Sequence, residues 1–463
     1  MLVEERDPSS RQTLKVERDR RLGDLSTPNG VRKLQTALHA KAKAEPEFRF
    51  YALYDKLYRA DVLAYAYDCC RANKGAAGVD GVTFADIEAY GRERWLGELA
   101  AALKEEKYRP RAVKRVYLRK PNGKLRPLGI PCLMDRVCMT AGVLVLGPIF
   151  EADLPEEQYG YREGIDAHRA IGEVRELLLK GHREIVDADL SSYFDTIPHP
   201  ELLQSIARRV VDRRVLHLIK MWLEAPVEET DKRGRKKRTT PNRDLRQGSP
   251  QGSPISPLMA NIYMRRFILW WKRSEVASRL GAKVVNFADD MVICCRRGAD
   301  EVLAAMRTTM AKLKLTINEE KTRTCRIPEE TFDFLGYTFG KNYSPKTGKV
   351  YIGPRPSKQR VRRMIEKVHE QTTRKTLYVQ DAEQVKQLNL MLRGWANYFS
   401  LGPVNSAYRA IDAYTKKRLR RWLGKKHKKD TGAHACYPDK YLYRQLGLVC
   451  LPQLTKRLPW AKA

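Results

Sequence analysis

The chain has 463 residues, with 88 Lys and Arg against 55 Asp and Glu, so its net charge is +33. This excess is larger than solubility requires and predicts a polyanionic partner, with nucleic acid ranked ahead of an anionic membrane surface. No apolar run reaches the ~18 residues of a membrane-spanning helix, and residues 1–7 are charged where a signal peptide is apolar. We therefore expect no membrane partner and a place in the cytoplasm or nucleoid of a bacterium.

The chain begins with a polar, basic lead-in over residues 1–70. Strand-like runs on either side of Asn122-Gly123 predict a hairpin over 115–128, because Asn-Gly is the strongest short signal for a hairpin turn. Other elements expected in the first half are a glycine-rich loop (73–81), an apolar helix (132–150) and a strand (184–190).

The basic run 232–238 interrupts the chain and is expected to form an exposed loop. Two apolar runs, rich in β-branched residues, flank Phe287-Ala288-Asp289-Asp290 and predict a second hairpin. A domain boundary is expected at 345–356, where Pro and Gly interrupt the pattern. The remaining expected elements are helices over 257–280 and 299–313, strands over 315–318 and 332–339, and helices beyond 356.

The second hairpin carries two adjacent carboxylates, Asp289 and Asp290, at its tip. Hard divalent cations would neutralise such a pair, although a solvated Asp-Asp turn is the more common structure. Asp189 lies 100 residues before Asp289, at the end of another apolar strand, and strands distant in sequence are often neighbours in one sheet. Three converging carboxylates would hold two Mg²⁺ ions and support the displacement of a phosphoryl group.

These acidic motifs, together with other short motifs along the chain, resemble those of reverse transcriptases, specifically the group II intron type with its maturase extension. The tip 287–290 resembles the catalytic motif of the palm, with Phe287 where many relatives have Tyr. The other blocks that carry the resemblance are 73–81, 123–131, 158–162 with 167–168, 189–195, 250–258, 318–322 and 334–336, within roughly residues 70–425.

The resemblance implies an α+β fold, the right-hand polymerase with fingers, a palm built on an antiparallel sheet and a helical thumb, followed by a helical maturase domain. The implied segments are the lead-in (1–70), the fingers and palm (71–345), the thumb and maturase domain (346–429) and a short tail with possible DNA binding (430–463).

The same resemblance implies that Asp189 and Asp289 are the main ligands of two Mg²⁺ ions, for which Mn²⁺ can substitute. Asp290 is the weaker third ligand or acts through its charge alone. Phe194 resembles a steric gate against a 2′-hydroxyl, with a core aromatic as the alternative. Lys321 would protonate the departing pyrophosphate, contact a phosphate, or be an ordinary surface lysine.

Gln251 and Gly252 resemble residues that line the nucleotide pocket, where Gly permits a close approach. Arg119, Lys120 and Arg126 lie on the first hairpin and are expected to close over the triphosphate. A solvated hairpin face is the alternative for these three cations.

Clustered Lys and Arg in the last third of the chain predict salt-dependent binding to an RNA backbone. The expected RNA-binding residues are Arg360, Arg362, Arg363, Lys416, Lys417, Arg418, Arg420, Arg421, Lys425 and Lys426. Asp187, Asp195, Trp395 and Tyr398 are instead interpreted as structural.

We therefore expect an RNA-directed DNA polymerase that uses dNTPs, a structured RNA template and a DNA primer or target, and that assists the splicing and mobility of a group II intron RNA. No Cys-x-x-Cys or His-Asn-His pattern follows residue 430, so the endonuclease domain of many relatives is expected to be absent. Two alternatives stay open: a domesticated or defence-associated reverse transcriptase without an intron, and a splicing-only RNA-binding maturase. The oligomeric state is also left open.

Overall fold

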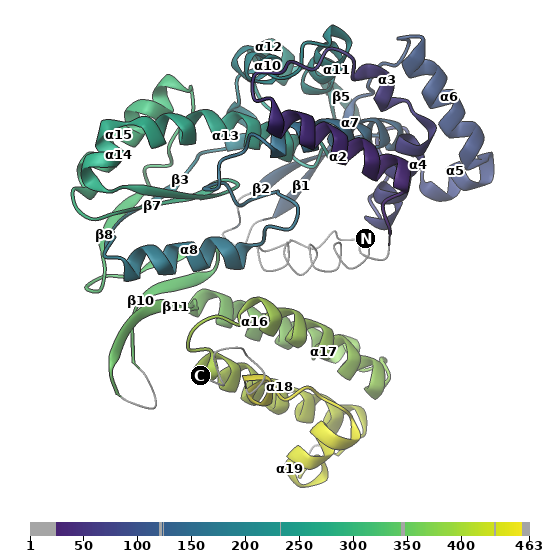
Figure 1. Ribbon diagram of the computed structural model, residues 1–463. Helices are drawn as coiled ribbons and strands as arrows, with labels where there is room; N and C mark the ends of the chain where they lie inside the picture. The colour runs from purple at the N-terminus through teal and green to yellow at the C-terminus, as the bar shows by residue number, and fades with distance from the viewer. Residues whose placement is uncertain are drawn as a thin grey trace. The chain divides into compact units, whose positions relative to one another are not determined.

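The computed structural model describes residues 25–119, 123, 125–231, 233–343, 348–429 and 432–455. These residues form two compact units, shown in Figure 1. The first contains residues 25–170 and 185–324, and the second contains 171–184 and 325–455. Mixed helix and sheet agree with the predicted α+β class.

The first unit begins with helices around one apolar core. These are α2 (Asn29–Ala44), α3 (Tyr54–Leu57), α4 (Ala60–Ala72), α5 (Phe84–Tyr90), α6 (Arg92–Lys104) and α7 (Leu133–Glu151). The apolar helix expected over 132–150 is confirmed as α7. The expectation that no apolar run is long enough to span a membrane is wrong, because α7 is long enough. By length and composition alone α7 passes that test, yet 67% of the apolar window is buried. Such burial is typical of a core helix, and α7 packs against α2 and α4.

One sheet of the first unit has the strand order β2-β1-β4-β5, and we call it the hairpin sheet. Its strands are β1 (Val113–Arg119), β2 (Leu125–Ile130), β4 (Val227–Thr230) and β5 (Lys236–Thr239). The predicted hairpin is confirmed as the antiparallel pair β1–β2. Residues 233–235 form the expected exposed loop, whereas 236–238 belong to β5 of a second hairpin, β4–β5, because β4 pairs in parallel with β1 and draws β5 into the sheet. Lys232 lies outside the described residues.

A second sheet, in the order β6-β7-β3-β8, carries the three predicted aspartates, and we call it the acidic sheet. Its strands are β3 (Glu184–Asp189), β6 (Lys283–Phe287), β7 (Asp290–Cys295) and β8 (Arg323–Arg326). The predicted hairpin is confirmed as the antiparallel pair β6–β7. The remaining helices of this part of the chain are α8 (Ala167–Leu179), α9 (Tyr193–Thr196), α10 (His199–Ala207), α11 (Arg213–Leu223), α12 (Pro241–Leu245), α13 (Ser256–Arg273), α14 (Glu275–Leu280) and α15 (Ala299–Lys312).

Three sequence-based boundaries differ from the structure. The helix expected over 257–280 breaks at Ser274, whose extended backbone and hydroxyl cap α14. The strand expected over 315–318 is reduced to a single bridge between Ile317 and Leu190. The strand expected over 332–339 turns at Leu335 and Gly336, which both have positive φ. It therefore forms two antiparallel strands.

The second unit contains those strands and a helical bundle. Its three-stranded sheet has the order β11-β10-β9, with β9 (Phe332–Phe334), β10 (Tyr337–Tyr343) and β11 (Val350–Pro356). The proline-rich segment expected to be a boundary therefore belongs largely to β11, an edge strand, where a missing N–H is tolerated. The division between the units falls earlier, after Thr324.

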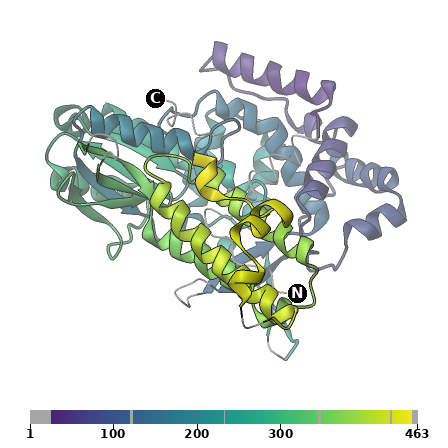
Figure 2. The same cartoon turned by 90° about the horizontal axis from the view of Figure 1, so that it is seen from below.

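The bundle is formed by α16 (Lys358–Gln371), α17 (Asp381–Tyr398) and α18 (Asn405–Lys426), which lie side by side in Figures 1 and 2. Short elements complete it: η1 (Arg374–Thr376), α19 (Ala433–Cys436), η2 (Tyr441–Gln445) and α20 (Leu451–Leu454). Trp395 and Tyr398 are buried, as predicted, and Trp395 packs against Phe399 and Tyr408.

Candidate active site

The acidic tip is a tight turn with a strained residue. Phe287 pairs with Asp290, so Ala288 and Asp289 form the turn itself. Ala288 has a φ of 60°, a left-handed conformation that costs a residue with a Cβ about 1–2 kcal/mol. Asn286 is only 1% exposed, and its Nδ2 donates to the carbonyls of Ala288 at 3.0 Å and Asp290 at 3.3 Å. These bonds hold the turn in its strained form.

A second support comes from the block at 158–162. The Tyr159 amide donates to the Asn286 carbonyl at 2.8 Å, and the Asn286 amide donates to the Glu157 carbonyl at 2.9 Å. At Gly160, a Cβ would lie 2.4 Å from the amide nitrogen of Ala288, so the turn can approach only a glycine. Sequence reasoning missed Asn286, although a polar residue inside an apolar strand was a signal.

Asp189 ends β3, which neighbours β7 in the acidic sheet. Its Oδ2 accepts from Lys321 Nζ at 2.8 Å and from Asn318 Nδ2 at 3.0 Å. The Asn318 amide also donates to the Asp189 carbonyl at 2.8 Å. The block 318–322 therefore positions this carboxylate. Whether Lys321 delivers a proton to pyrophosphate stays a prediction.

The donor chemistry of the three aspartates fits divalent cations. Carboxylate oxygens are the ligands that Mg²⁺ prefers, and the Asp189 carboxylate already pairs with the cationic Lys321. Asp189, Asp289 and Asp290 are all partly exposed, so substrate can reach them. Among the described residues, no three acidic, His or Cys side chains form a ready-made metal cage. Substrate oxygens and water would therefore have to complete the coordination.

A chain of hydrogen bonds connects three segments of the predicted nucleotide pocket. Arg126 Nε, on β2, donates to Gln251 Oε1 at 3.1 Å, and Gln251 Nε2 donates to Asp195 Oδ2 at 3.1 Å. Burial raises the pKa of Asp195, while the nearby charge of Arg115 and the bond from Gln251 lower it. Asp195 was interpreted as structural, and it is structural in a specific sense, because it orients Gln251.

The loop after Gln251 lies against the hairpin sheet. The Gly129 amide donates to the Gln251 carbonyl at 2.6 Å. Gly252 has a φ of 105°, and a Cβ there would lie 2.5 Å from the Gly129 carbonyl oxygen. The positive φ and the close approach to Gly129 explain why position 252 holds a glycine.

Phe194 lies in the short helix α9 and is largely buried. Its ring meets the ring of Tyr161 edge-on, with centroids 6.1 Å apart, and its carbonyl accepts from the Ser249 amide at 2.7 Å. The ring therefore packs against Tyr161, while the Phe194 backbone holds the start of the loop that carries Gln251. Its role as a steric gate stays a prediction.

Arg119 and Arg126, two of the three predicted triphosphate contacts, lie on opposite faces of the first hairpin. Arg126 pairs across the hairpin with Leu118, whereas Arg119 pairs with Leu125. Because successive side chains of a strand point to opposite faces, Arg119 lies on the face opposite Arg126. Arg126 reaches Gln251, so the expectation that Arg119 closes on the same triphosphate is not supported. Lys120 lies outside the described residues.

The predicted RNA-binding residues divide into inward-facing and exposed groups. Arg420 is buried and contacts Asp439, and its Nε donates to the Tyr437 carbonyl at 2.8 Å. This geometry corrects the prediction for Arg420, whose guanidinium is used within the protein. Lys416 pairs with Asp439 at 2.8 Å, and Arg418 donates to Thr372 Oγ1 at 3.0 Å.

Other cations of the predicted set have different surroundings. Lys426 pairs with Asp381 at 2.8 Å, and Lys425 is partly exposed. Burial lowers the pKa of Arg360 to about 10. Arg363 is partly exposed. The exposed members are Arg362, Lys417 and Arg421, and they remain candidates for RNA contact.

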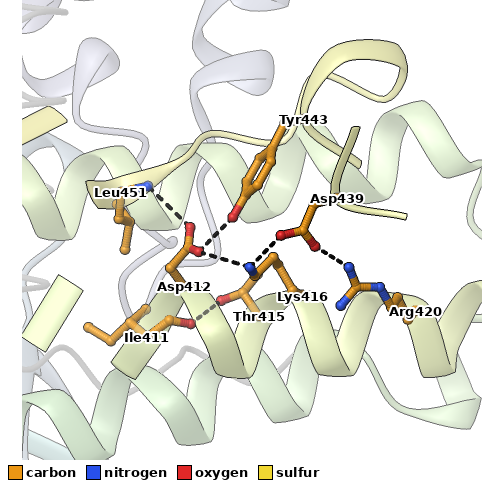
Figure 3. Close-up of polar contacts among 8 residues, drawn as sticks. All are labelled: Ile411, Asp412, Thr415, Lys416, Arg420, Asp439, Tyr443 and Leu451. Atoms are coloured by element: carbon orange, nitrogen blue, oxygen red, sulfur yellow. Dashed lines mark hydrogen bonds and ion pairs between the residues drawn. The ribbon is translucent and has the colours of Figure 1, made fainter. Parts of the chain in front are cut away.

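The inward-facing cations help to fasten the end of the described chain, as Figure 3 shows. Asp412, on α18, is buried and accepts from the Tyr443 hydroxyl at 2.6 Å and from the Leu451 amide at 3.2 Å. Burial and this bond raise the pKa of Tyr443 far above its usual range. The described part of the predicted DNA-binding tail is therefore packed onto α18.

Two family descriptions match the chain. "Reverse transcriptase (RNA-dependent DNA polymerase)" matches residues 118–339, and "Group II intron, maturase-specific domain" matches residues 361–439. Protein YkfC of Escherichia coli (strain K12) is 31% identical over 349 residues, which cover 66% of this chain and 87% of YkfC. The chain belongs to the group II intron reverse transcriptase and maturase family.

Further relatives of this reverse transcriptase are similar over shorter parts of their own length. Group II intron-encoded protein LtrA of Lactococcus lactis subsp. cremoris is 30% identical over 227 residues, covering 48% of this chain and 36% of LtrA. The putative COX1/OXI3 intron 1 protein of Saccharomyces cerevisiae is 24% identical over 327 residues. The aligned region covers 60% of this chain and 38% of the yeast protein. The reverse transcriptase domain implies a general dependence on divalent metal.

Replacing Asn286 with Ala should remove the support of the acidic turn. We expect the free energy of unfolding to fall by about 1–3 kcal/mol, because buried carbonyls lose their donor. Primer extension should fall further than this loss of stability explains. Urea unfolding and primer extension are the two measurements. The control is Asn73→Ala, which removes the hydrogen bond from the Asn73 side-chain amide to the Cys69 carbonyl at the end of α4, far in sequence from the turn. Equal extension by Asn286→Ala and Asn73→Ala would contradict the assignment.

The exposed residues Lys417 and Arg421 lie one turn apart on α18. Their double replacement by Ala should weaken RNA binding and make it less salt-dependent. The slope of log K against log salt should fall in magnitude by about 1.4–1.8 for two phosphate contacts. Thermal stability should hardly change. Arg420→Ala should instead lower stability, since the Tyr437 carbonyl loses its side-chain donor and Asp439 keeps only Lys416 as a cationic partner. An unchanged salt slope in the double variant would refute the phosphate contacts.

Proposed function

We propose that this reverse transcriptase extends a DNA primer on an RNA template by two-Mg²⁺ nucleotidyl transfer. The observation that carries the proposal is the placement of Asp189 and the turn Asp289-Asp290 on neighbouring strands of one sheet. When bound, the divalent cations would lower the charge barrier and activate the 3′-hydroxyl of the primer.

The side chains around the carboxylates have distinct roles in this proposal. Arg126 and Gln251 form one hydrogen-bonded unit, so the guanidinium is held ready to neutralise the triphosphate. Phe194 and Tyr161 form a rigid aromatic wall under the sugar of the incoming nucleotide. Lys321, which pairs with Asp189, would donate a proton to the departing pyrophosphate.

We also propose that the second unit binds a group II intron RNA and assists its splicing and mobility. The match of residues 361–439 to the maturase-specific domain supports this role, and so do the exposed cations of α16 and α18. Sequencing the RNA that copurifies with the protein tests it. Enrichment of a folded intron supports the proposal, whereas enrichment of unrelated RNA alone would favour a reverse transcriptase without an intron.

Asp289→Asn should abolish primer extension on an RNA template with Mg²⁺ and dNTPs. We expect a loss of at least ~100-fold, because the variant removes a charge on which the transition state depends. Asp55→Asn, a change of a half-exposed carboxylate on α3, is the matched control and should extend normally. If Asp289→Asn retains the rate of the control, the polymerase assignment fails.

Phe194→Ala should raise the use of ribonucleotides relative to deoxynucleotides. Removing the ring opens space for a 2′-hydroxyl, and we expect a change of about 10-fold or more in the ratio of kcat/KM values. Tyr193→Phe is the control, because it removes only a hydroxyl that bonds to the Ala260 carbonyl. An unchanged ratio in Phe194→Ala would show that Phe194 is only a core aromatic.

A further inference from the structure

Residues 246–252 form the loop that carries Gln251, and we call this segment the Gln251 loop. Backbone hydrogen bonds fasten it to the start of α10. The Gly248 amide donates to the Ile197 carbonyl at 2.8 Å, and the His199 amide donates to a carbonyl of the loop at 2.9 Å. The position of the Gln251 loop therefore depends on the segment that begins α10.

The side chain of His199 adds a further bond to this contact. Its Nε2 lies 2.7 Å from the Gly248 carbonyl oxygen, and because a carbonyl oxygen only accepts, Nε2 is the nitrogen that carries the proton. Gly248 has a φ of 96°, and a Cβ there would lie 3.0 Å from the Asp195 carbonyl oxygen. The ring therefore binds the Gln251 loop where its backbone approaches the neighbouring segment closely.

The surroundings of the second ring nitrogen favour a neutral imidazole. His199 is 3% exposed, and its Nδ1 has no hydrogen-bond partner among the described residues. A protonated ring would place a buried N–H at this position without an acceptor, which is unfavourable. His199 is also the first residue of α10, where the helix dipole disfavours a positive charge.

Three charged groups act on this ring. Lys220 lies on α11, Glu224 caps the same helix, and Arg246 belongs to the Gln251 loop. Burial lowers the pKa of His199 below its ordinary value of 6.5. The bond to Gly248 and the charge of Glu224 raise this pKa, and the two cations lower it. Glu224 itself pairs with Lys220 at 3.9 Å, so its charge is partly neutralised.

We propose that His199 is a positioning residue of the nucleotide pocket: its neutral ring binds Gly248 and thereby holds Gln251 in place for the incoming nucleotide. This inference rests on the proposed polymerase function. His199 acts through the Gln251 loop and not on the substrate itself. Gln251 in turn accepts from Arg126, so a displaced loop would also release the guanidinium that is proposed to neutralise the triphosphate.

The proposal implies a pH dependence with a definite sign. Because the ring bound to Gly248 has a lowered pKa, it binds a proton less readily than a ring released from the loop. Its contribution is therefore complete above the ordinary value of 6.5 and is lost as the pH falls through the lowered pKa. Acid should weaken the binding of the incoming nucleotide.

The test measures dNTP affinity in a complex that cannot react. The protein is mixed with Mg²⁺, an RNA template and a DNA primer that ends in a dideoxynucleotide. The readout is the dNTP concentration that protects this complex against a heparin competitor. His199→Leu should weaken dNTP binding about 5- to 30-fold, because the Gly248 carbonyl loses its donor. His199→Gln has an amide N–H as many bonds from the backbone as Nε2, and should stay within about 3-fold of wild type.

Tyr54→Phe is the matched control for a simple loss of stability. It removes a buried hydroxyl that donates to the Leu103 carbonyl at 2.9 Å, in the same compact unit. Like His199→Leu, it should lower the free energy of unfolding in urea, but it should leave dNTP affinity unchanged. Equal weakening of dNTP binding by Tyr54→Phe and His199→Leu, or wild-type affinity in His199→Leu, would overturn the proposal.

A pH profile tests the neutral ring without the Leu variant and decides the question even where that variant does not fold. Between about pH 8 and pH 5.5, the dNTP affinity of wild type should fall more steeply than that of His199→Gln, which has no titrating ring at this position. Other titrating groups, including the phosphates of the dNTP, act on both proteins alike. Parallel profiles would therefore refute the role of the neutral ring.

Failure of this inference is distinct from failure of the polymerase assignment. If wild type extends no primer on an RNA template, the polymerase assignment fails. If wild type extends primers while His199→Leu binds dNTP equally well and the two pH profiles are parallel, only the role of His199 fails.

Discussion

The proposed chemistry of this protein depends on holding two adjacent carboxylates at a tight turn in spite of their mutual repulsion and an unfavourable backbone. The turn needs a left-handed conformation at Ala288, where glycine is usual. Asn286 supports it from within the strand, and Gly160 lets a separate segment close against it. The carboxylates are therefore positioned by backbone contacts that carry no charge.

A chain of side-chain hydrogen bonds organises the predicted nucleotide pocket. Arg126 comes from the hairpin sheet, Gln251 from the loop before α13, and Asp195 from α9, and each side chain is oriented by the next. The contact of Gly252 with Gly129 adds a backbone constraint between two of them. Replacing any one of the three side chains is therefore expected to change the orientation of the others.

The net charge of +33 is not spread evenly over one function. Arg420 and Lys416 fasten the last described elements to α18 through Asp439, and Arg238 and Lys236 fasten β5 through Glu228. Beside each of these pairs lies a cation that faces solvent: Lys417 on α18 and Lys237 on β5. The position of each side chain on its helix or strand decides which cation binds within the protein and which faces solvent.

The sequence by itself determined the family, the two hairpins, the apolar helix α7 and the three aspartates, because these depend on local patterns and on the order of short motifs. It did not reveal that residues 236–238 of the basic run join a sheet, because β4 pairs in parallel with β1, more than 100 residues earlier. It also grouped Arg119 with Arg126, although the alternation of the hairpin puts their side chains on opposite faces. It grouped Arg420 with Lys417 as well, although Arg420 is buried against Asp439 and Lys417 is exposed. Only the tertiary structure decided these questions, because the partners that take up a charge, Gln251 for Arg126 and Asp439 for Arg420, are brought near by folding and not by sequence.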